Sequence, residues 1–460
     1  MKVKWVKSFM FLVAIMPSSS DAFHHVYPII KSSSSKLCAL ERRRDLLFEG
    51  TGSPSKPGWK NSRISRLTEW AGSKESNRPI IGEYDPNGWW LWRKWQGTVL
   101  KMTKGSIIRL MGMGLLLDIL ARKHGKLAGS TWSLLEVPLK TSMIQSLTGI
   151  RKMWQYHLTL ATFILTFFLS QAYGYWQKVY NTCRMIQGRI NDICLLLTVG
   201  AKRMPRNDET GKDGYNDEAE LLLRRCARLL RISHIFFWAA TPTASNGLTD
   251  CEEFLEDGAV PPPEDGVAPL LLNSSGLKAL VASGQLSAAE AEDLMTSSLP
   301  PSQYAFMTLV WIGIHVMDGL EKGLFRGGQG WEENILRQLT TLRACMFDID
   351  DFRAGRMPLA YVHLVQVMVD SLVFLAPFAL YPELGSMAIP LVGLMTLFFR
   401  GLLALSKSFL DPFGVEGFGE QDIRVDVLVS ELNFGAAKRW IQGGKTLPEG
   451  LSKINFSPSV

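Results

Sequence analysis

Four long apolar runs dominate the hydrophobic pattern of this chain, at about residues 105–121, 154–173, 359–381 and 387–410. At a rise of about 1.5 Å per helical residue, helices of this length approach what is needed to cross the roughly 30 Å hydrocarbon core of a bilayer. We therefore expect four membrane-spanning helices. The last two are separated only by Pro382 to Ser386, and so short a connection predicts an antiparallel hairpin.

Each apolar run also contains polar side chains that are costly in lipid. They are Arg109 and Asp118 in the first run, His157 and Gln171 in the second, His363, Gln366 and Asp370 in the third, and Arg400 in the fourth. Such groups normally face the interior of a helix bundle or a water-filled cavity. The pattern indicates a bundle, although a large soluble α-helical protein with long core helices is the alternative.

The N-terminal residues have the pattern of two successive targeting segments. Three lysines precede the apolar residues 9–16 and small residues flank Asp21, so residues 1–22 predict a secretory signal peptide. Residues 23–40 lack acidic residues and contain four consecutive serines, which is typical of a transit peptide. We expect a transit peptide and disordered linker over residues 23–77, similar to the bipartite plastid leaders of diatoms and related algae. A plain secretory signal followed by a disordered linker is the alternative.

A more polar section separates the second and third apolar runs. Residues 219–240 mix leucines with arginines and predict an amphipathic helix whose arginines face solvent or membrane phosphates. Residues 241–275 are acidic and rich in proline, which predicts a loop insertion. Ser287 and Glu290 have the spacing of a capping box, and the short apolar run 304–316 predicts a buried helix outside the membrane.

Composition supports a membrane protein and argues against several other classes. Hydrophobic residues make up 47% of the 460 residues and charged residues only 20%. The net charge of +7 is spread along the chain, so we expect no nucleic-acid partner. The six cysteines show neither a Cys-x-x-Cys pair nor a regular spacing with histidine, which argues against a disulfide framework or zinc site and favours isolated buried thiols. The common hydrolase, metalloprotease and phosphate-loop motifs are missing from the sequence, and we expect no enzymatic activity.

Several short motifs follow one another in a fixed order. They are Trp92 to Gly97, Tyr175-Trp176 with Tyr180 and Gly188-Arg189, Leu221 to Arg228, Leu280-Val281 with Gly284 and Ala288 to Glu290, Thr341-Leu342-Arg343, Met357 to Tyr361, and Asp411-Pro412-Phe413-Gly414. This series resembles the bestrophin anion channels over about residues 90–442. The resemblance implies an all-α membrane protein with four transmembrane helices per subunit, a helical extramembrane portion, and a homopentamer around one central pore. We therefore predict a bestrophin-like channel domain over residues 78–442 and a C-terminal tail over residues 443–460.

The resemblance places the narrow neck of the pore on the second apolar run, at Thr159, Phe163 and Phe167. Their four-residue spacing puts all three on one face of a helix. Five copies of each phenylalanine would form rings whose positive edges favour a partly dehydrated anion over a cation. The Thr159 hydroxyls would make the neck easier to wet and so weaken gating by dewetting. A second constriction, the aperture, falls at Gly330 and Trp331.

The resemblance also marks the place where calcium-regulated relatives bind their ion. The acidic residues there are Asp411, Glu416, Glu420 and Asp422. They are more widely spaced than the dense acidic run of those relatives, and calcium needs several converging carboxylates. We expect weak calcium binding at most, with a simple exit from helix to loop as the alternative. We expect no other cofactor.

These features together predict a passive channel for chloride, with bicarbonate as a second candidate ion, in a lipid membrane. The leader favours a plastid membrane, above all the thylakoid, and a plasma membrane or endomembrane is the alternative. Two other functions stay open: a non-conducting membrane scaffold of the same fold, and a soluble helical enzyme or binding protein. Extraction without detergent would favour the soluble protein.

Overall fold

The computed structural model describes residues 98–126, 141–204, 214–241, 270–414, 422–434 and 436–445, together with residues 71, 80 and 81. All of them belong to the second of two compact units, Lys60–Val460. The predicted signal peptide, nearly all of the predicted leader and linker, and most of the acidic loop and C-terminal tail lie outside the described residues.

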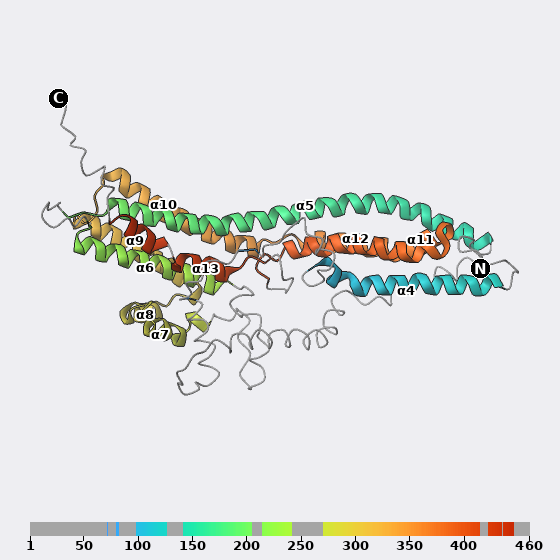
Figure 1. The fold of residues 1–460 in the computed structure, drawn as a ribbon, viewed down its shortest axis with the longest axis horizontal. Coiled ribbons are helices and arrows are strands. Elements are labelled where there is room, and N and C mark those ends of the chain that lie inside the picture. The colour runs from blue at the N-terminus through green and yellow to red at the C-terminus, as the bar shows by residue number, and fades with distance from the viewer. Residues whose placement is uncertain are drawn as a thin grey trace, which may run out of the picture. The chain divides into compact units, whose positions relative to one another are not determined.

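The described residues are almost entirely helical (Figure 1). Two isolated antiparallel bridges, Ala201 with Phe325 and Arg203 with Tyr215, are the only β pairing within them. The α-helices are α4 (Val99–Lys126), α5 (Thr141–Gly200), α6 (Asp217–Ala240), α7 (Ser274–Ala282), α8 (Ala288–Thr296), α9 (Tyr304–Glu321), α10 (Gln329–Ala354), α11 (Leu359–Leu384), α12 (Ala388–Phe409), α13 (Val425–Phe434) and α14 (Ala436–Gly443), and the 3-10 helices are η4 (Leu270–Leu272), η5 (Pro301–Gln303) and η6 (Gly385–Met387). The predicted α-helical class is confirmed.

Helix α5 is much longer than the apolar run that predicts it. It has 60 residues and a length of about 90 Å, because no proline interrupts residues 141–200 and buried apolar positions recur from Leu147 to Leu197. The N-terminal part packs against α11 and α12, and the C-terminal part against α10 and α14 (Figure 1). One helix therefore joins an apolar bundle, made of α4, α11, α12 and the N-terminal part of α5, to the more polar remainder.

Helices α11 and α12 form the predicted antiparallel hairpin. Asp370 pairs with Arg400, and four residues earlier on α11, Gln366 pairs with Lys407, which lies later on α12. Contacts in this reversed order require antiparallel helices. The turn between them includes Gly385, whose φ of +52° is a conformation that favours glycine.

Two helical stretches among the described residues are long and apolar enough to cross a membrane by length and composition alone. One lies within Leu147–Gly200 on α5, and the other is Leu359–Phe409, which contains both α11 and α12. Helix α4 is not one of these stretches, because charged residues such as Lys104, Arg109 and Asp118 interrupt its apolar positions. The prediction of four separate spans therefore stays a prediction.

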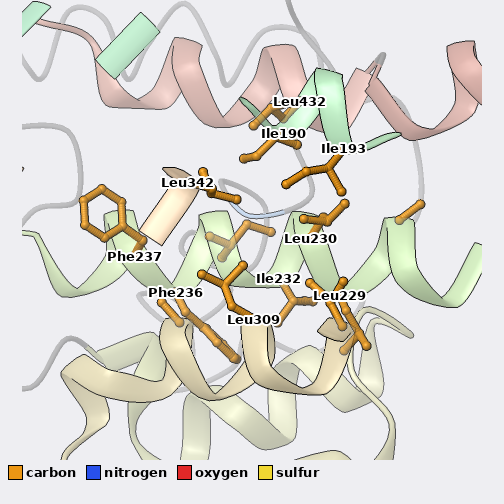
Figure 2. Close-up of a cluster of buried hydrophobic side chains, with 14 of the residues drawn as sticks. Ile190, Ile193, Leu229, Leu230, Ile232, Phe236, Phe237, Leu309, Leu342 and Leu432 are labelled. Carbon is orange, nitrogen blue, oxygen red and sulfur yellow. The ribbon is translucent and has the colours of Figure 1, made fainter. Parts of the chain in front are cut away.

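The part outside the apolar bundle has its own hydrophobic core, centred on α6. Figure 2 shows Leu229, Ile232 and Phe236 of α6 beside Leu309 of α9. From Ile232 to Ala239 every residue of α6 is buried, so only the first half of the helix is amphipathic. The expectation of an amphipathic helix over all of residues 219–240 is wrong for the second half, because α9 and neighbouring elements enclose it. The predicted helix 304–316 is confirmed as part of α9, and the capping box of Ser287 and Glu290 is confirmed at the start of α8.

Candidate functional site

The three predicted neck residues lie together on a face of α5 that no described element covers. Phe163 is 71% exposed and Phe167 is 53% exposed, and Thr159 is exposed as well. The opposite face of the same turns is buried, with Leu165 and Phe168 packed against α11 and α12. The two apolar stripes of α5 therefore have different surroundings: one faces the bundle, and the other is free to face a pore.

Polar contacts hold α5 in this rotation about its axis. The Trp154 indole Nε1 donates a hydrogen bond to the Leu372 carbonyl oxygen at 2.8 Å. One turn later, His157 Nε2 lies 2.9 Å from the Met368 carbonyl oxygen and 3.0 Å from the Ser371 hydroxyl. Both contacts reach across to α11, on the side away from Phe163. They fix which stripe of α5 stays uncovered.

The hydroxyl of Thr159 has a specific chemical role at this face. Its Oγ1 donates to the Gln155 carbonyl oxygen at 3.3 Å, as Thr162 and Thr166 do toward carbonyls four residues earlier. The hydroxyl proton is thus directed to the helix backbone, and the oxygen lone pairs remain for water. Thr159 can therefore wet the surface without offering a free donor to an anion.

A chain of polar contacts crosses the interior of the apolar bundle from α4 through α12 to α11. Arg400 pairs with Asp370 at 2.7 Å and donates to the Ser106 hydroxyl at 2.6 Å. Gln366 donates to Asp370 at 2.6 Å and accepts from Lys407 Nζ at 2.6 Å. The predicted interior position of Arg400, Asp370 and Gln366 is confirmed, because each is partly buried and contacts a side chain on another helix.

The other polar residues of the apolar runs divide into two groups. Asp118 is buried and accepts hydrogen bonds from the Tyr381 and Ser386 hydroxyls at 2.9 and 3.0 Å, which confirms its interior position. In contrast, the side chains of Arg109, Gln171 and His363 are exposed on the subunit. These three do not lie in the interior of the subunit, and the expected alternative, a water-filled cavity, stays a prediction.

The predicted aperture residues lie at the start of α10 and differ in their surroundings. Gly330 is exposed, and a Cβ placed there would meet no atom within 4 Å. Trp331 is half-buried: its Nε1 donates to the Leu196 carbonyl oxygen at 3.1 Å, and its ring stacks on Phe325 with centroids 5.1 Å apart. Its ring also lies against Gly200, because a Cβ placed on Gly200 would lie 2.6 Å from two carbon atoms of the Trp331 ring. Trp331 therefore fastens α10 to the C-terminal end of α5.

The acidic turn after α12 is described only in part. Asp411 is buried, and the Ile423 amide donates to the Pro412 carbonyl oxygen at 2.7 Å. Gly414 has a φ of +70° and lies directly against the Asp422 carboxylate, which leaves no room for a side chain. Glu416 and Glu420 lie outside the described residues, and within those residues no group of three or more His, Cys, Asp or Glu side chains could hold a metal. Calcium binding stays a prediction.

Outside the apolar bundle, burial and pairing shift several ionisable groups. Burial alone would raise the pKa of Glu290, but hydrogen bonds from Arg228 and Ser287 outweigh it and lower the pKa to about 2. Burial lowers the pKa of His234 to about 3, so its neutral Nε2 accepts a hydrogen bond from Trp238 at 2.8 Å. Burial raises the pKa of the Cys194 and Cys226 thiols to about 12. Unreactive thiols agree with the predicted buried cysteines, and Cys183 and Cys345 are buried too.

Sequence reasoning missed several residues that shape this site. Trp154, Ser106 and Lys407 complete polar contacts between helices, but the sequence analysis did not single out any of the three. A second omission is the continuation of the uncovered face of α5 past the neck, where Gln177 and Asn181 are exposed. A helical period of 3.6 applied from Phe163 onward would have found both.

The comparison with protein families supports the resemblance in the sequence. Residues 279–435 match the family model described as Bacterial/Fungal Bestrophin protein. Residues 279–435 therefore form a bestrophin-like segment. The matched segment contains α11, α12, the start of α10 and Asp411, whereas Thr159, Phe163 and Phe167 precede it. This family match, together with the two apolar stretches long enough to cross a membrane, indicates an integral membrane protein.

The chain is also similar to solved structures. Two are variants of a bacterial bestrophin homologue from Klebsiella pneumoniae, 14% and 15% identical, with 74% of this chain and 98% and 100% of theirs covered and TM-scores of 0.46. A third, described as a membrane protein, is 14% identical, with 75% of this chain and 98% of that chain covered and a TM-score of 0.49. None of the curated proteins matches this chain.

Proposed function

We propose that this chain is the subunit of a homopentameric anion channel whose single central pore is lined by the uncovered face of α5. The observation that carries the proposal is the position of Phe163 and Phe167. Both are exposed on α5, while the opposite face of that helix is packed on α11 and α12. Five uncovered faces around one axis would place these side chains in rings at the neck, with Thr159 one turn away.

The apolar bundle supports four membrane spans per subunit, formed by α4, the N-terminal part of α5, α11 and α12. Ile108 and Leu116 on α4 and Phe398 on α12 expose large apolar side chains. Exposed apolar side chains on a bundle with paired charges inside suit contact with lipid. The channel domain would then extend over residues 78–442, followed by the tail 443–460.

The charge pattern of α5 favours anions. The helix contains no aspartate or glutamate before Asp192, whereas the exposed Lys152 and Lys178 precede and follow the neck; Arg151 and Arg184 are paired with Glu383 and Glu431. A pathway lined by this helix would carry positive potential at both ends of the neck, which raises the local concentration of anions. Phenyl edges in the neck add a weakly positive surface for a partly dehydrated ion. Chloride is the first candidate and bicarbonate the second.

We propose a plastid membrane, above all the thylakoid, as the location, where anion flow would balance charge moved by proton pumping. Support comes only from the leader pattern in residues 1–22 and 23–77. Fusion of residues 1–77 to a fluorescent protein in an algal cell tests it. Fluorescence at the plasma membrane or endomembranes would contradict it.

Aperture and calcium site belong to the same proposal. The start of α10 at Gly330 and Trp331 would lie near the extramembrane end of the pore, because Trp331 contacts the end of α5.

Asp411 and Asp422, with Glu416 and Glu420, would bind calcium weakly. Isothermal titration of the purified protein with calcium tests the site, and binding that survives Asp422→Asn would contradict it.

The decisive experiment is halide flux through liposomes containing the mature protein. Phe163→Ala and Phe167→Ala should change permeability and halide selectivity. Phe398→Ala is the matched control, because Phe398 is 54% exposed, similar to Phe167 at 53%, but belongs to α12 and not to the face of α5 that carries the neck residues. Unchanged flux and selectivity in both neck variants would refute the pore assignment. A wild-type protein that conducts under no ion condition would favour the scaffold, and a detergent-solubilised mass other than a pentamer would contradict the assembly.

A further inference from the structure

One face of α4 is left uncovered by the other helices of the apolar bundle. The opposite face packs on α12 (Figure 1), so closely that a Cβ at Gly401 would lie 2.5 Å from Cγ1 of Val99. Two turns later on α4, the Ser106 hydroxyl accepts a hydrogen bond from Arg400 at 2.6 Å. These contacts fix the rotation of α4 about its axis, so its uncovered face is a constant feature of the subunit.

The uncovered face carries two lysines followed by a row of apolar side chains. Residues within about 40° of Ile108, at 100° per residue, are all exposed, and they are Lys101, Lys104, Gly112, Leu115 and Ile119. Ile108 itself is 70% exposed. The apolar part, from Ile108 to Ile119, extends over about 16 Å. This length is close to half of the roughly 30 Å hydrocarbon core, which is the depth of one leaflet.

The lysines at the start of this face have no acidic neighbour to neutralise them. Helix α4 contains no aspartate or glutamate before Asp118, and that carboxylate accepts hydrogen bonds from Tyr381 and Ser386. Within the part of the chain that the structure describes, no carboxylate pairs with Lys101 or Lys104. Two ammonium groups one turn apart therefore form a positive surface at this end of α4.

A third cation is directed to the same end of the helix. Arg109 is exposed on the flank of this face, and its guanidinium points back toward the start of α4. Its Nε donates to the Gly105 carbonyl oxygen at 3.2 Å, and Nη2 donates to the Ser106 hydroxyl at 3.4 Å. Long basic side chains near the end of a membrane helix place their charge at the interface in this way. The charge of Arg109 therefore adds to that of the two lysines.

The cationic end of α4 lies on the side of the bundle that continues into the extramembrane helices. Val99 packs on Gly401, in the C-terminal half of α12. The chain then continues from α12 to Phe413, whose ring lies against Trp238 of α6 with centroids 5.8 Å apart. A bilayer around the apolar bundle would end at this level, so the three cations would lie among the lipid headgroups of that leaflet.

We propose that Lys101, Lys104 and Arg109 bind the acidic headgroup of a membrane lipid, whose acyl chains lie along the apolar part of the same face of α4. The inference rests on the proposed membrane position of α4 and not on ion conduction. A neutral headgroup would leave the three positive charges unpaired. A soluble anion would pair with them but would not cover the apolar row beside them. An acidic lipid matches both parts of the face.

The test measures lipid binding by the assembled mature protein in detergent, using native mass spectrometry. Phosphatidylglycerol and phosphatidylcholine with the same acyl chains are the two probes, and the wild type should bind the first roughly tenfold more tightly. Each basic residue near an acidic headgroup contributes about a fivefold gain in affinity. Lys101→Gln combined with Lys104→Gln should therefore weaken phosphatidylglycerol binding roughly tenfold or more, while phosphatidylcholine binding stays unchanged.

Three further variants separate charge at this face from general effects. Lys278→Gln combined with Lys322→Gln is the matched control, because it removes the same charge from exposed positions on α7 and just after α9. Its lipid binding should equal that of the wild type. Lys101→Arg combined with Lys104→Arg keeps the charge and should keep the preference for phosphatidylglycerol. Lys104→Gln alone should weaken binding about fivefold, and it protects the test against misassembly of the double variant.

The outcomes separate the lipid site from the channel proposal. Equal binding of the two lipids by the wild type, or an unchanged preference in the glutamine variants, overturns the lipid site. Displacement of phosphatidylglycerol by an equal concentration of glycerol phosphate overturns the lipid as the occupant, because the acyl chains would then contribute nothing. A wild type without anion flux overturns the channel proposal and leaves the lipid site standing. A failed lipid test leaves the channel proposal standing.

Discussion

Close packing of α12 on α4 at Gly401 predicts that even one added methyl group destabilises the apolar bundle. A Cβ at Gly401 would lie 2.5 Å from Cγ1 of Val99, far inside van der Waals contact. Val99 is β-branched and has few alternative rotamers, so the helices must separate. Overpacking of this kind costs about 1–3 kcal/mol, and alanine returns about 1 kcal/mol of helix propensity over glycine. Gly401→Ala should therefore lower the free energy of unfolding by about 0–2 kcal/mol.

A matched variant isolates the packing contribution. Gly112 lies in the middle of α4, and a Cβ there would meet no atom within 4 Å, so Gly112→Ala retains the propensity gain alone. The two variants should differ by about 1–3 kcal/mol, with Gly401→Ala the less stable. Denaturant unfolding in detergent micelles, followed by the loss of helical circular dichroism, measures the difference. Equal stability of the two variants would refute the close approach of α4 and α12.

Two further predictions concern charge pairs. The pKa of Glu290 is lowered from 4.5 to about 2, so its pairing with Arg228 contributes stability above pH 4.5 that is lost as the pH falls through 2. Glu290→Gln should therefore lower the free energy of unfolding by about 2–3 kcal/mol at neutral pH and leave it unchanged at the acid limit. Glu292→Gln is the control, and its free energy of unfolding should follow that of the wild type at every pH. Asp370→Asn removes the partner of Arg400 in the apolar bundle and should cost about 2 kcal/mol; a double-mutant cycle with Arg400→Met that shows no coupling would contradict the pairing.

Helix positions and the hairpin were predictable because they depend on local pattern. The apolar runs at 359–381 and 387–410 correspond closely to α11 and α12, since proline, glycine and serine between them leave room only for a turn. The length of α5 was not predicted. Its apolar stripe continues past residue 173 with more polar residues between, and the helical period was not followed beyond the membrane-length run.

The positions of the site residues could be predicted from the sequence only where the geometry of a single helix determines them. The common face of Thr159, Phe163 and Phe167 follows from spacing alone. Trp331 is different, because its surroundings depend on Leu196 and Gly200, which precede it by more than 130 residues. A motif in the sequence can indicate that Trp331 lies near the aperture. It cannot show that the indole of Trp331 donates its hydrogen bond to another helix.

The choice between the two apolar faces of α5 shows why tertiary contacts had to be seen. Phe163 and Phe167 form one apolar stripe, and Leu165 and Phe168 form another, so periodicity alone does not predict which of them stays uncovered. The decision comes from Trp154 and its hydrogen bond to α11, supported one turn later by a histidine contact to the same helix. A side chain that loses a buried hydrogen bond leaves an unsatisfied carbonyl behind, at a cost of about 1–3 kcal/mol. Rotation of α5 to present the other stripe would break both contacts, and for that reason the phenylalanine face stays uncovered.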